Sequence, residues 1–400
     1  MNKQTVKDIP VKGKRVLMRV DFNVPLDEHF NITDDARIVK ALPTIKYCLE
    51  QNARLVLMSH LGRPDGKHNS KFSLAPAAKH LAKLLGKKVD LLPDCIGPVV
   101  EDRVNALKDG EVVMLENLRF HAGEETNDPA FSRKLADLGD VYVNDAFGTA
   151  HRAHSSTVGV TKFLPAVAGF LLAKEVEYFD KAVKHPERPF MTILGGAKVS
   201  DKVKLISNLL DKADAILIGG AMAYTFYKLM GIGIGTSKFE QAGLEPAREA
   251  MAKAKAKNIP LYFPSDRVIA QKFEKNAENK VVSTDIPEGW MGLDIGPDSV
   301  KKFCEVLSKA KTVVWNGPVG VFEMPPFDRG TRGLAEFLGN LKATTIIGGG
   351  DTAAAIKLFG LEDKFSHVST GGGASLEYLE GTPLPGIEAI LDKSAASAVR

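Results

Sequence analysis

The chain has few cysteines and no long apolar run, and both absences narrow the class of protein. Only three cysteines, Cys48, Cys95 and Cys304, occur among 400 residues, far apart and odd in number. They form neither a disulfide framework nor a metal-binding spacing, so a reducing compartment is expected. No apolar stretch approaches bilayer-spanning length, and the polar N-terminus lacks a signal-peptide apolar region. We therefore expect a soluble cytoplasmic protein without a membrane partner.

The chain also lacks a strong excess of charge of either sign. Lysine and arginine number 53 and the acidic residues 49, giving a formal net charge of +4. So small an excess argues against a general nucleic-acid binder, although it does not exclude local basic clusters. The apolar fraction of 44% is ordinary for a globular protein. A chain of this length is expected to form roughly two or three domains.

Neither of the common nucleotide-binding fingerprints is present, yet residues 344–355 show a related pattern. The β-branched run 344–347 ends at Gly348-Gly349-Gly350, and Asp351 begins an alanine-rich helical pattern. The run lacks the Gly-Lys-Ser/Thr of a Walker A motif and the spacing of a Rossmann fingerprint. A strand, a glycine turn and a helix start can bind an anion, and Asp351 can hold a cation that bridges phosphates. The alternative is an ordinary βα loop with an N-capping aspartate.

The first half of the chain repeats one plan, in which short apolar runs end in polar residues and helical patterns follow. The runs are 16–20, 55–58, 112–115 and 141–143. Strands that alternate with helices predict a parallel sheet with right-handed crossovers. Because ligands bind at the carboxyl ends of such strands, the polar residues should gather at one edge of the sheet.

That edge is rich in arginine and histidine. The residues in or near these turns are Arg37, His60, Arg63, Arg119, His151, Arg152 and His154. Any one of them could be a solvated surface charge, but their recurrence after successive strands predicts a site for carboxylate or phosphate groups. The His151–His154 spacing could suggest a metal, but no third ligand lies at a usual spacing, so we favour the anion site.

The second half repeats the plan with glycine in place of arginine. The turns in question are Gly195-Gly196, Gly219-Gly220, Gly317, Gly348–Gly350 and Gly371–Gly373. Glycine turns with lysine and aspartate between them suit a polyphosphate and predict a nucleotide domain. Between the halves, a long helical pattern over 163–184 precedes Pro186 and Pro189 and predicts a connecting helix.

With both edges in view, the chain resembles the phosphoglycerate kinase family. The motifs that carry the resemblance are Arg19–Pro25, Ser59–Pro64, Glu116–Phe120, Asn144–Arg152, Leu194–Lys202, Trp315–Pro318, Gly348–Thr352 and Ser369–Ser375. They span nearly the whole chain in the family's order. Each motif alone is weak, but together they are highly specific.

The resemblance implies an α/β fold of two doubly wound, Rossmann-like parallel-sheet domains that face a cleft. Its domains would be 1–168, with segment 385–400 packing back on it, a hinge helix 169–185, and a nucleotide domain 186–384. It implies reversible phosphoryl transfer between 1,3-bisphosphoglycerate and Mg-ADP, giving 3-phosphoglycerate and Mg-ATP. The cofactor would be Mg²⁺, and the protein would act as a monomer on small molecules by hinge bending.

The resemblance also implies roles for particular residues. The phosphoglycerate site would comprise Asp21, Asn23, Arg37, His60, Leu61, Gly62, Arg63, Arg119 and Arg152. The nucleotide site would comprise Lys202, Gly220, Asn316, Glu323, Gly349, Gly350, Asp351 and Thr352, with Asp351 as the metal ligand. The catalytic groups would be Arg37, Lys198, Lys202, Gly350 and Gly373, the last at a helix start that points at the transferred group.

These residue types fit phosphoryl transfer between oxygens that are already anionic. Such a transfer needs positioning and charge neutralisation but no general base. A dehydrogenase would share the alternating plan but requires a Gly-x-Gly-x-x-Gly turn, which none of these glycine turns has. A non-catalytic nucleotide-binding scaffold of the same fold would tolerate loss of Arg37, Lys202 or Asp351, all of which are present.

Overall fold

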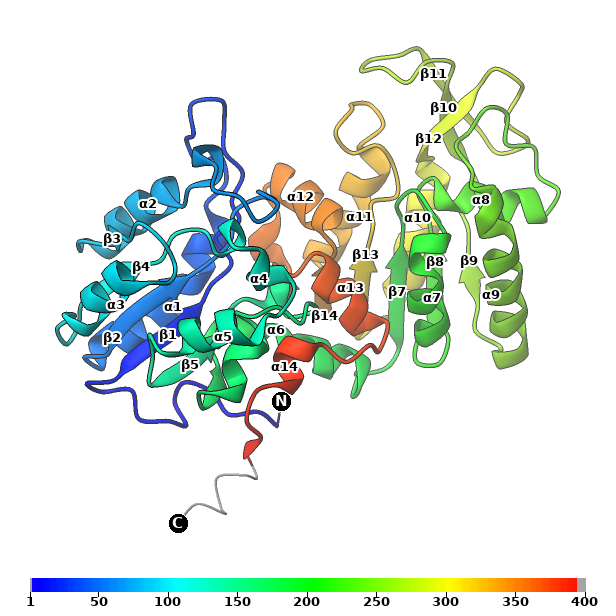
Figure 1. The fold of residues 1–400 in the computed structure, drawn as a ribbon. Coiled ribbons are helices and arrows are strands. Elements are labelled where there is room, and N and C mark those ends of the chain that lie inside the picture. Colours follow the sequence, from blue (N-terminus) through cyan, green and yellow to red (C-terminus); the bar gives the residue numbers. More distant parts are fainter. Residues whose placement is uncertain (1, 394–400) are drawn as a thin grey trace. The chain divides into compact units, whose positions relative to one another are not determined.

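The computed structural model describes residues 2–393, and its backbone contacts divide the chain into two compact units (Figure 1). Unit 1 is Met1–Glu177 together with Pro383–Arg400, and unit 2 is Tyr178–Thr382. Each unit is built on a six-stranded parallel sheet. The predicted fold class, two parallel-sheet α/β domains, is confirmed. None of the helices in the described part of the chain is long and apolar enough to cross a bilayer.

The sheet of unit 1 has the strand order β3-β4-β2-β1-β5-β6. Its strands are β1 Arg15–Arg19, β2 Arg54–Met58, β3 Asp90–Leu91, β4 Val112–Met114, β5 Val141–Asn144 and β6 Ala166–Ala168. Its helices are α1 Ala36–Glu50, α2 Ala75–Leu85, α3 Pro98–Asn105, α4 Ala122–Glu125, α5 Pro129–Ala136 and α14 Pro385–Glu388. Successive side chains of a strand point to opposite faces, so Val16 and Met18 join one core and Leu17 the other. Helices α1 and α2 cover the first core, and α3 and α5 the second.

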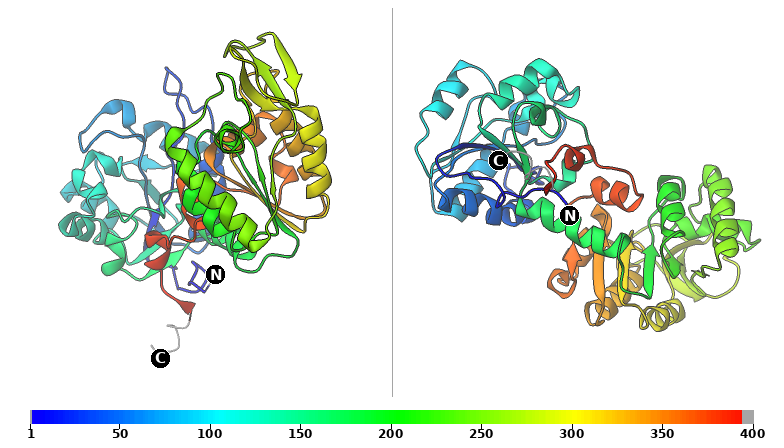
Figure 2. Two further views of the ribbon diagram at one scale, coloured as in Figure 1. Left: turned by 90° about the vertical axis from the view of Figure 1, so that its right-hand side faces the viewer. Right: turned by 90° about the horizontal axis from the view of Figure 1, so that it is seen from below.

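The sheet of unit 2 has the order β15-β14-β13-β7-β8-β9. Its strands are β7 Phe190–Leu194, β8 Ala215–Ile218, β9 Leu261–Tyr262, β13 Thr312–Asn316, β14 Thr344–Gly348 and β15 His367–Val368. Its helices are α7 Val203–Leu209, α8 Met222–Leu229, α9 Leu244–Lys257, α10 Pro297–Leu307, α11 Arg329–Gly339, α12 Gly350–Leu358 and α13 Gly373–Leu379. Helices lie on both faces of this sheet, as Figure 2 shows in its left view.

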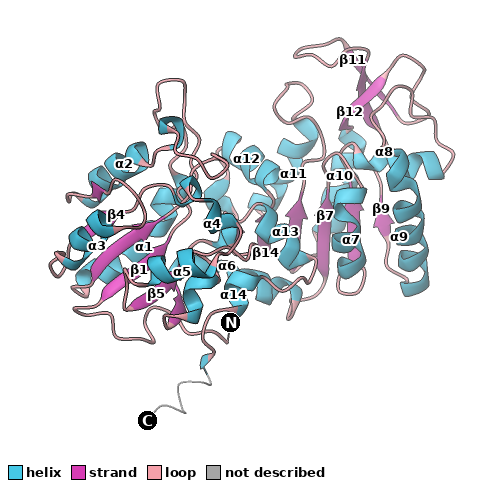
Figure 3. Ribbon diagram, viewed as in Figure 1, coloured by secondary structure: helices cyan, strands magenta, loops and turns pink. Residues whose placement is uncertain are grey.

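Unit 2 also contains a three-stranded antiparallel sheet that the sequence did not predict (Figure 3). Its strands are β10 Arg267–Ala270, β11 Asn279–Val282 and β12 Met291–Ile295, in the order β11-β10-β12. Strand β11 has the sequence Asn-Lys-Val-Val and is mostly exposed, so it does not show the apolar run of a core strand. Strands β10 and β12 contribute a wall to the cavity described below.

In each parallel sheet, the order in which the chain adds successive strands reverses at one point, the switch point. An α/β fold binds its ligand at this point. In unit 1 the reversal lies between β1 and β5, because β1 is followed by β2 on one side and β5 by β6 on the other. In unit 2 it lies between β7 and β13 for the same reason. The turns after these four strands therefore mark the expected sites in each unit.

The connecting helix begins later in the chain than the helical pattern over 163–184 predicted. Helix α6 is Phe170–Val183, and residues 166–168, which fell within the predicted helical pattern, form β6 beside β5. Pro165 interrupts the pattern, and its carbonyl oxygen accepts a hydrogen bond from Tyr142 N (2.9 Å). The contact boundary between the units falls inside α6, after Glu177.

The segment after residue 384 packs on unit 1 as far as the structure describes it. Asn144 Nδ2 donates to Gly386 O (3.1 Å), Leu391 N donates to Ala166 O (3.0 Å), and Leu391 O accepts from Gln4 N (2.7 Å). The remainder of the predicted C-terminal segment, residues 394–400, lies outside the described residues.

Candidate active site

In unit 1, the turns after β1 and β2 are held together by polar contacts. Arg37, in the first turn of α1, donates from Nη1 to Asp21 Oδ2 (3.0 Å) and to Asn23 O (3.1 Å). Asn23 Oδ1 in turn accepts from Gly62 N (2.9 Å). The structure thus brings together four residues that the sequence predicted for one site, and it leaves the Arg37 side chain 35% exposed and accessible to a ligand.

Arg119 lies deeper in the same region and retains an unpaired donor. It follows Asn117, which caps the short 3₁₀ helix Leu118–Phe120 by accepting a hydrogen bond from Arg119 N. Its Nη1 donates to Gly62 O (2.8 Å), and its Nε lies 3.2 Å from Glu125 Oε1. Its Nη2 is buried and has no hydrogen-bond partner among the described residues. A buried guanidinium with a free N–H is a receptor for an anionic oxygen.

His60 lies at the centre of this basic region. Burial, together with the charges of Arg19, Arg119, Arg37 and Arg152, lowers the pKa of His60 well below its usual range. The imidazole is therefore neutral at physiological pH. Four guanidinium groups around one neutral ring create a positive potential that favours a multiply charged anion.

The positive charge of the same arginines also acts on His154. Burial and the charges of Arg119, Arg19 and Arg152 lower the pKa of His154 to about 4, with His151 contributing less. Its Nδ1 lies 3.8 Å from Glu124 Oε1, and Arg152 Nε donates to His151 Nε2 (3.3 Å). The positive charge of these arginines favours an anion over a metal cation at the His-x-x-His pair.

Sequence reasoning missed the residues that anchor the cluster, Arg19 and Glu124. Arg19 is 1% exposed; its Nε donates to Ser156 Oγ (2.8 Å), and its Nη2 lies 3.1 Å from His60 Nδ1. Ser156 donates from Oγ (2.5 Å) and from N (3.0 Å) to the two carboxylate oxygens of Glu124, which is fully buried. An arginine directly after the apolar residues Val16–Met18 was the available signal for Arg19, and Glu124 had none.

The remaining predicted residues of unit 1 differ in exposure. Leu61 is buried, Gly62 and Arg152 are half-buried, and Arg63 is exposed. Gly62 has φ +62°, and a Cβ there would lie 2.4 Å from the Phe72 ring, so the turn requires glycine. The turn therefore presents backbone close to Arg119 and leaves Arg63 at the surface.

In unit 2, the glycine turns after β7 and β13 pack directly against each other. A Cβ on Gly195 would lie 2.1 Å from Pro318 O, and Gly196 N donates to that oxygen (2.9 Å). Gly220 has φ +66°, and its N donates to Val319 O (3.1 Å). Glycine is required here so that these backbones can approach one another, and the turns form one floor.

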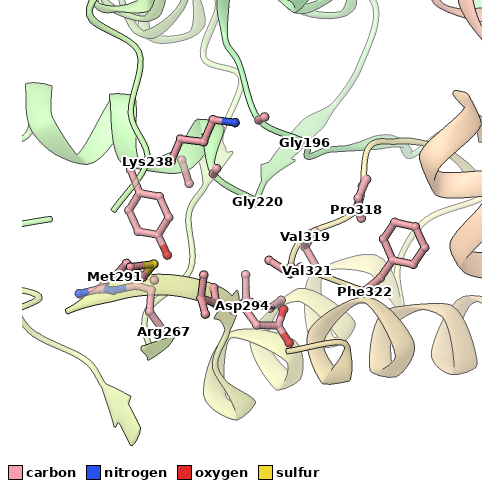
Figure 4. A pocket seen from close by; sticks show the side chains of 18 of the residues that line it. Gly196, Gly220, Lys238, Arg267, Met291, Asp294, Pro318, Val319, Val321 and Phe322 are labelled. Carbon is pink, nitrogen blue, oxygen red and sulfur yellow. Dashed lines mark hydrogen bonds between the residues drawn. The ribbon is translucent and has the colours of Figure 1, made fainter. Parts of the chain in front are cut away.

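Above this floor lies a cavity of about 500 Å³ (Figure 4). The glycine turns contribute Gly196, Gly220 and Pro318, and apolar side chains including Met291, Val321 and Phe322 contribute other walls. Its ionisable lining residues are Lys238, Arg267, Asp294, Glu323, Asp351, Tyr224 and Tyr227. An apolar, concave site with a few polar groups at its edge suits a planar ring joined to a charged chain.

Lys202, from the segment after β7, meets Asn316, the last residue of β13. Lys202 Nζ donates to Asn316 O (3.2 Å) and also to Asn316 Oδ1. Burial lowers the pKa of Lys202 to about 8, although the carboxylates of Asp351 and Asp201 act in the opposite direction. Asn316 Nδ2 is buried and has no partner among the described residues. This part of the site therefore offers an amide N–H donor beside an ammonium group whose pKa is lowered.

The starts of α12 and α13 are tied to these turns. Thr352 Oγ1 accepts from Gly317 N (2.7 Å), which fixes the first turn of α12 against the turn after β13. Gly349 caps α12 with φ +85°, and its N donates to Ser375 Oγ (3.2 Å). Ser375 Oγ donates to Gly372 O (2.7 Å), the cap of α13, so Gly350 and Gly373 begin neighbouring helices.

Asp351 and Glu323 both line the cavity, whereas Lys198 is in a different position. A carboxylate such as that of Asp351 is a hard oxygen donor, which is the ligand type that Mg²⁺ prefers. Lys198 is exposed and close enough to Glu240 for its charge to help lower that carboxyl's pKa, after the hydrogen bonds from Ser200. Of the residues predicted for the nucleotide site and for catalysis in unit 2, only Gly220, Glu323 and Asp351 line the cavity; the others, Lys198, Lys202, Asn316, Gly349, Gly350, Thr352 and Gly373, do not.

A model of the family described as phosphoglycerate kinase matches residues 6–382. The chain belongs to the phosphoglycerate kinase family. The phosphoglycerate kinase of Fervidobacterium nodosum is 54% identical over 398 residues, covering 98% of this chain and 99% of that protein. The phosphoglycerate kinase of Chlorobium limicola is 55% identical over 397 residues, covering 98% of this chain and 100% of that protein.

A solved structure of phosphoglycerate kinase from Coxiella burnetii gives a TM-score of 0.88 at 42% identity, covering 97% of this chain and 98% of that one. The predicted family and the enzyme class, a phosphotransferase with a carboxyl group as acceptor, are therefore confirmed. Family members named cytosolic, from Nicotiana tabacum, and chloroplastic, from Volvox carteri, are both among the relatives.

Proposed function

We propose that this chain transfers a phosphoryl group reversibly between 1,3-bisphosphoglycerate and Mg-ADP, giving 3-phosphoglycerate and Mg-ATP. The observation that carries the assignment is the contrast between the two sites. Unit 1 holds arginines around the neutral His60, and unit 2 holds a glycine-floored cavity lined by Asp351, with Lys202 close to Gly196 of its floor. A small acid with several negative charges suits the first site and a nucleotide suits the second.

In unit 1, Arg119 and Arg152 bind the phosphate of phosphoglycerate, with Arg63 at the rim of the site. Arg37 neutralises oxygens of the carboxyl-phosphate. Asp21 and Asn23 keep Arg37 in position, as the hydrogen bonds at 3.0 and 3.1 Å indicate. His60 and the turn at Leu61 and Gly62 complete the site. Because His60 Nδ1 accepts from Arg19 Nη2, the Nε2–H of the neutral imidazole can donate a hydrogen bond to a substrate oxygen.

In unit 2, the cavity takes the base and ribose of the nucleotide, and the glycine turns take its phosphates. Gly220 lies beneath the base, and Glu323 accepts from the ribose hydroxyls. Lys202, Asn316 and Thr352 line the path of the phosphates, together with the N–H groups at Gly349 and Gly350. Asp351 holds the magnesium, which supplies neutralisation of phosphate charge when it is bound.

Catalysis then depends on positioning and electrostatics. The attacking oxygen is anionic in either direction, so the chain needs no general base. Arg37, Lys202 and Lys198 neutralise charge on the moving group, and N–H groups at Gly350 and Gly373 donate to its equatorial oxygens. Since the two substrates bind different units, we propose that transfer requires closure about the hinge helix over residues 169–185.

A coupled turnover assay tests this function. The expected outcome is ATP formation from ADP and 1,3-bisphosphoglycerate that depends on magnesium. Calorimetric binding of Mg-ADP and 3-phosphoglycerate without turnover would instead support a non-catalytic scaffold of the same fold. We also propose a cytoplasmic monomer, which light scattering of the purified chain and cell fractionation would check.

A further inference from the structure

A group of metal-ligating side chains lies in unit 1, among residues to which the proposed function gives no role. Asp94 and Cys95 lie in the loop after β3, and His121 follows the 3₁₀ helix after β4. One ligand atom from each of these three residues lies within 4.8 Å of the other two. Strands β3 and β4 are neighbours, so their carboxyl ends bring the two loops together. The Glu116 N to Asp94 O hydrogen bond (3.3 Å) ties these loops at the backbone.

The side chains are already oriented toward one another. His121 Nε2 lies 2.7 Å from Asp94 Oδ1, and Cys95 N donates to the same oxygen (2.6 Å). The His121 ring stacks on Phe131 with centroids 5.3 Å apart, which restricts its rotation. Cys95 is fully buried, whereas the side chains of His121 and Asp94 are 30% and 45% exposed. An ion can therefore enter from the solvent side and meet the thiol on the inner side.

A cavity of about 400 Å³, lined by His121 and by residues of α4 and α5, adjoins the group. It leaves room for a fourth ligand from solvent. Tetrahedral zinc with sulfur at about 2.3 Å and nitrogen or oxygen at about 2.0 Å places its ligand atoms about 3.5 Å apart. The present separations, 2.7 Å for one pair and at most 4.8 Å for the others, reach that spacing by side-chain rotation.

We propose that Asp94, Cys95 and His121 form a binding site for one Zn²⁺ ion, with solvent as the fourth ligand. Thiolate, imidazole and carboxylate are the three ligand types that zinc takes in proteins. On binding, the Cys95 thiol releases its proton to solvent and the thiolate sulfur bonds the metal. The ion clamps the β3 loop to the segment after Arg119 and so stabilises unit 1. No sequence motif marks this site, because its ligands come from separate loops without a short Cys/His spacing.

The chain provides a matched control for this site. His80 Nε2 lies 2.8 Å from Asp35 Oδ2, with side chains 30% and 42% exposed. Both the distance and the exposures are close to those of His121 and Asp94, but no cysteine completes a three-ligand group there among the described residues. If a histidine–aspartate pair alone bound the ion, the two sites would behave alike.

The experiment uses the full chain, stripped with a chelator and titrated with Co²⁺ as a spectroscopic substitute for Zn²⁺. The expected result is one Co²⁺ per chain with a sulfur-to-metal charge-transfer band, displaced by Zn²⁺. Cys95→Ser and His121→Gln should abolish the band and weaken Zn²⁺ binding by more than about 100-fold, since losing even an outer partner costs roughly 10–100-fold. His80→Gln and Cys304→Ser should leave both unchanged.

Because Cys95 is fully buried, its replacement could unfold the chain, and the half-exposed His121 provides the second variant. Circular dichroism confirms that His121→Gln is folded before titration. Zn²⁺ should also raise the melting temperature of the original chain and of His80→Gln but not of His121→Gln. Absence of a charge-transfer band, or a band that survives in His121→Gln, would overturn the assignment. Neither result bears on turnover, so the proposed function is tested independently.

Discussion

Lys202 should make nucleotide binding sensitive to alkaline pH. Its ammonium is largely removed from water beside Asn316, and burial lowers its pKa from 10.5 to about 8. In our assignment the charged form meets the nucleotide's phosphates. Binding should then require a proton on Lys202, and that proton is lost from the empty protein only about one unit above neutral pH.

The size of the effect follows from the pKa. At about pH 9, only about a tenth of the empty protein carries the ammonium, so affinity for Mg-ADP should fall about tenfold for each pH unit above about 8. The effect on folding has the opposite sign. Because the folded pKa lies below the unfolded one, the buried charge costs up to about 3 kcal/mol below pH 8. That cost is relieved as pH rises from about 8 to about 10.5.

Calorimetry of Mg-ADP binding between about pH 6.5 and about pH 9.5 measures the dependence, and two variants isolate its source. Lys202→Arg keeps a permanent charge, so its affinity should stay level over this range. Lys202→Met should bind weakly at every pH and should be more stable to urea near neutral pH than the original chain. An affinity of the original chain that is level to about pH 9.5, or an equal decline in Lys202→Arg, would refute the reasoning.

Four further perturbations test other parts of the structure. Arg37→Ala should reduce turnover by about two to three orders of magnitude while calorimetry shows unchanged Mg-ADP affinity, since it removes one charge-stabilising donor from unit 1; near-normal turnover would exclude Arg37 from the mechanism. Asp351→Asn should weaken Mg-ATP binding more than binding of metal-free ATP, whereas equal losses would indicate a helix cap only. Burial raises the pKa of Asp145 to about 6, so its ionisation opposes folding and the stability it contributes is lost as pH rises through about 6. Asp145→Asn should therefore remove about 2 kcal/mol of the decline in urea stability between about pH 4.5 and about pH 7.5, and an unchanged decline would show that another group causes it. Small-angle scattering should show a smaller radius of gyration with both substrates bound than with either alone, and equal radii in all samples would argue against closure.

The sequence predicted best what depends on local pattern. Runs such as 55–58 and 344–347 form strands β2 and β14, because β-branched and apolar residues between turn signals favour a buried strand. The turns after β1 and β2 lie at the carboxyl ends of neighbouring strands, so Asn23 and Gly62 meet as a parallel sheet requires, and Arg37 of α1 donates to Asn23 O. The start of α6 was misjudged because an Ala-Val-Ala run suits a helix and a short strand equally, and pairing with β5 decided the outcome.

The electrostatic environment of the buried side chains could not be predicted from local sequence patterns, because it depends on segments that are distant in the chain. Arg19 can be buried at the end of β1 only because Ser156, 137 residues away, accepts from its Nε, and Glu124 accepts in turn from Ser156. An uncompensated buried charge would cost several kcal/mol, so the carboxylate and the guanidinium must be buried together. Yet their spacing in sequence carries no periodicity that could reveal the pair. The neutral state of His60 follows from the same assembly, since burial, together with arginines from four separate segments, lowers its pKa. A motif can therefore identify which side chains reach a site, whereas their protonation depends on the packing of the whole unit.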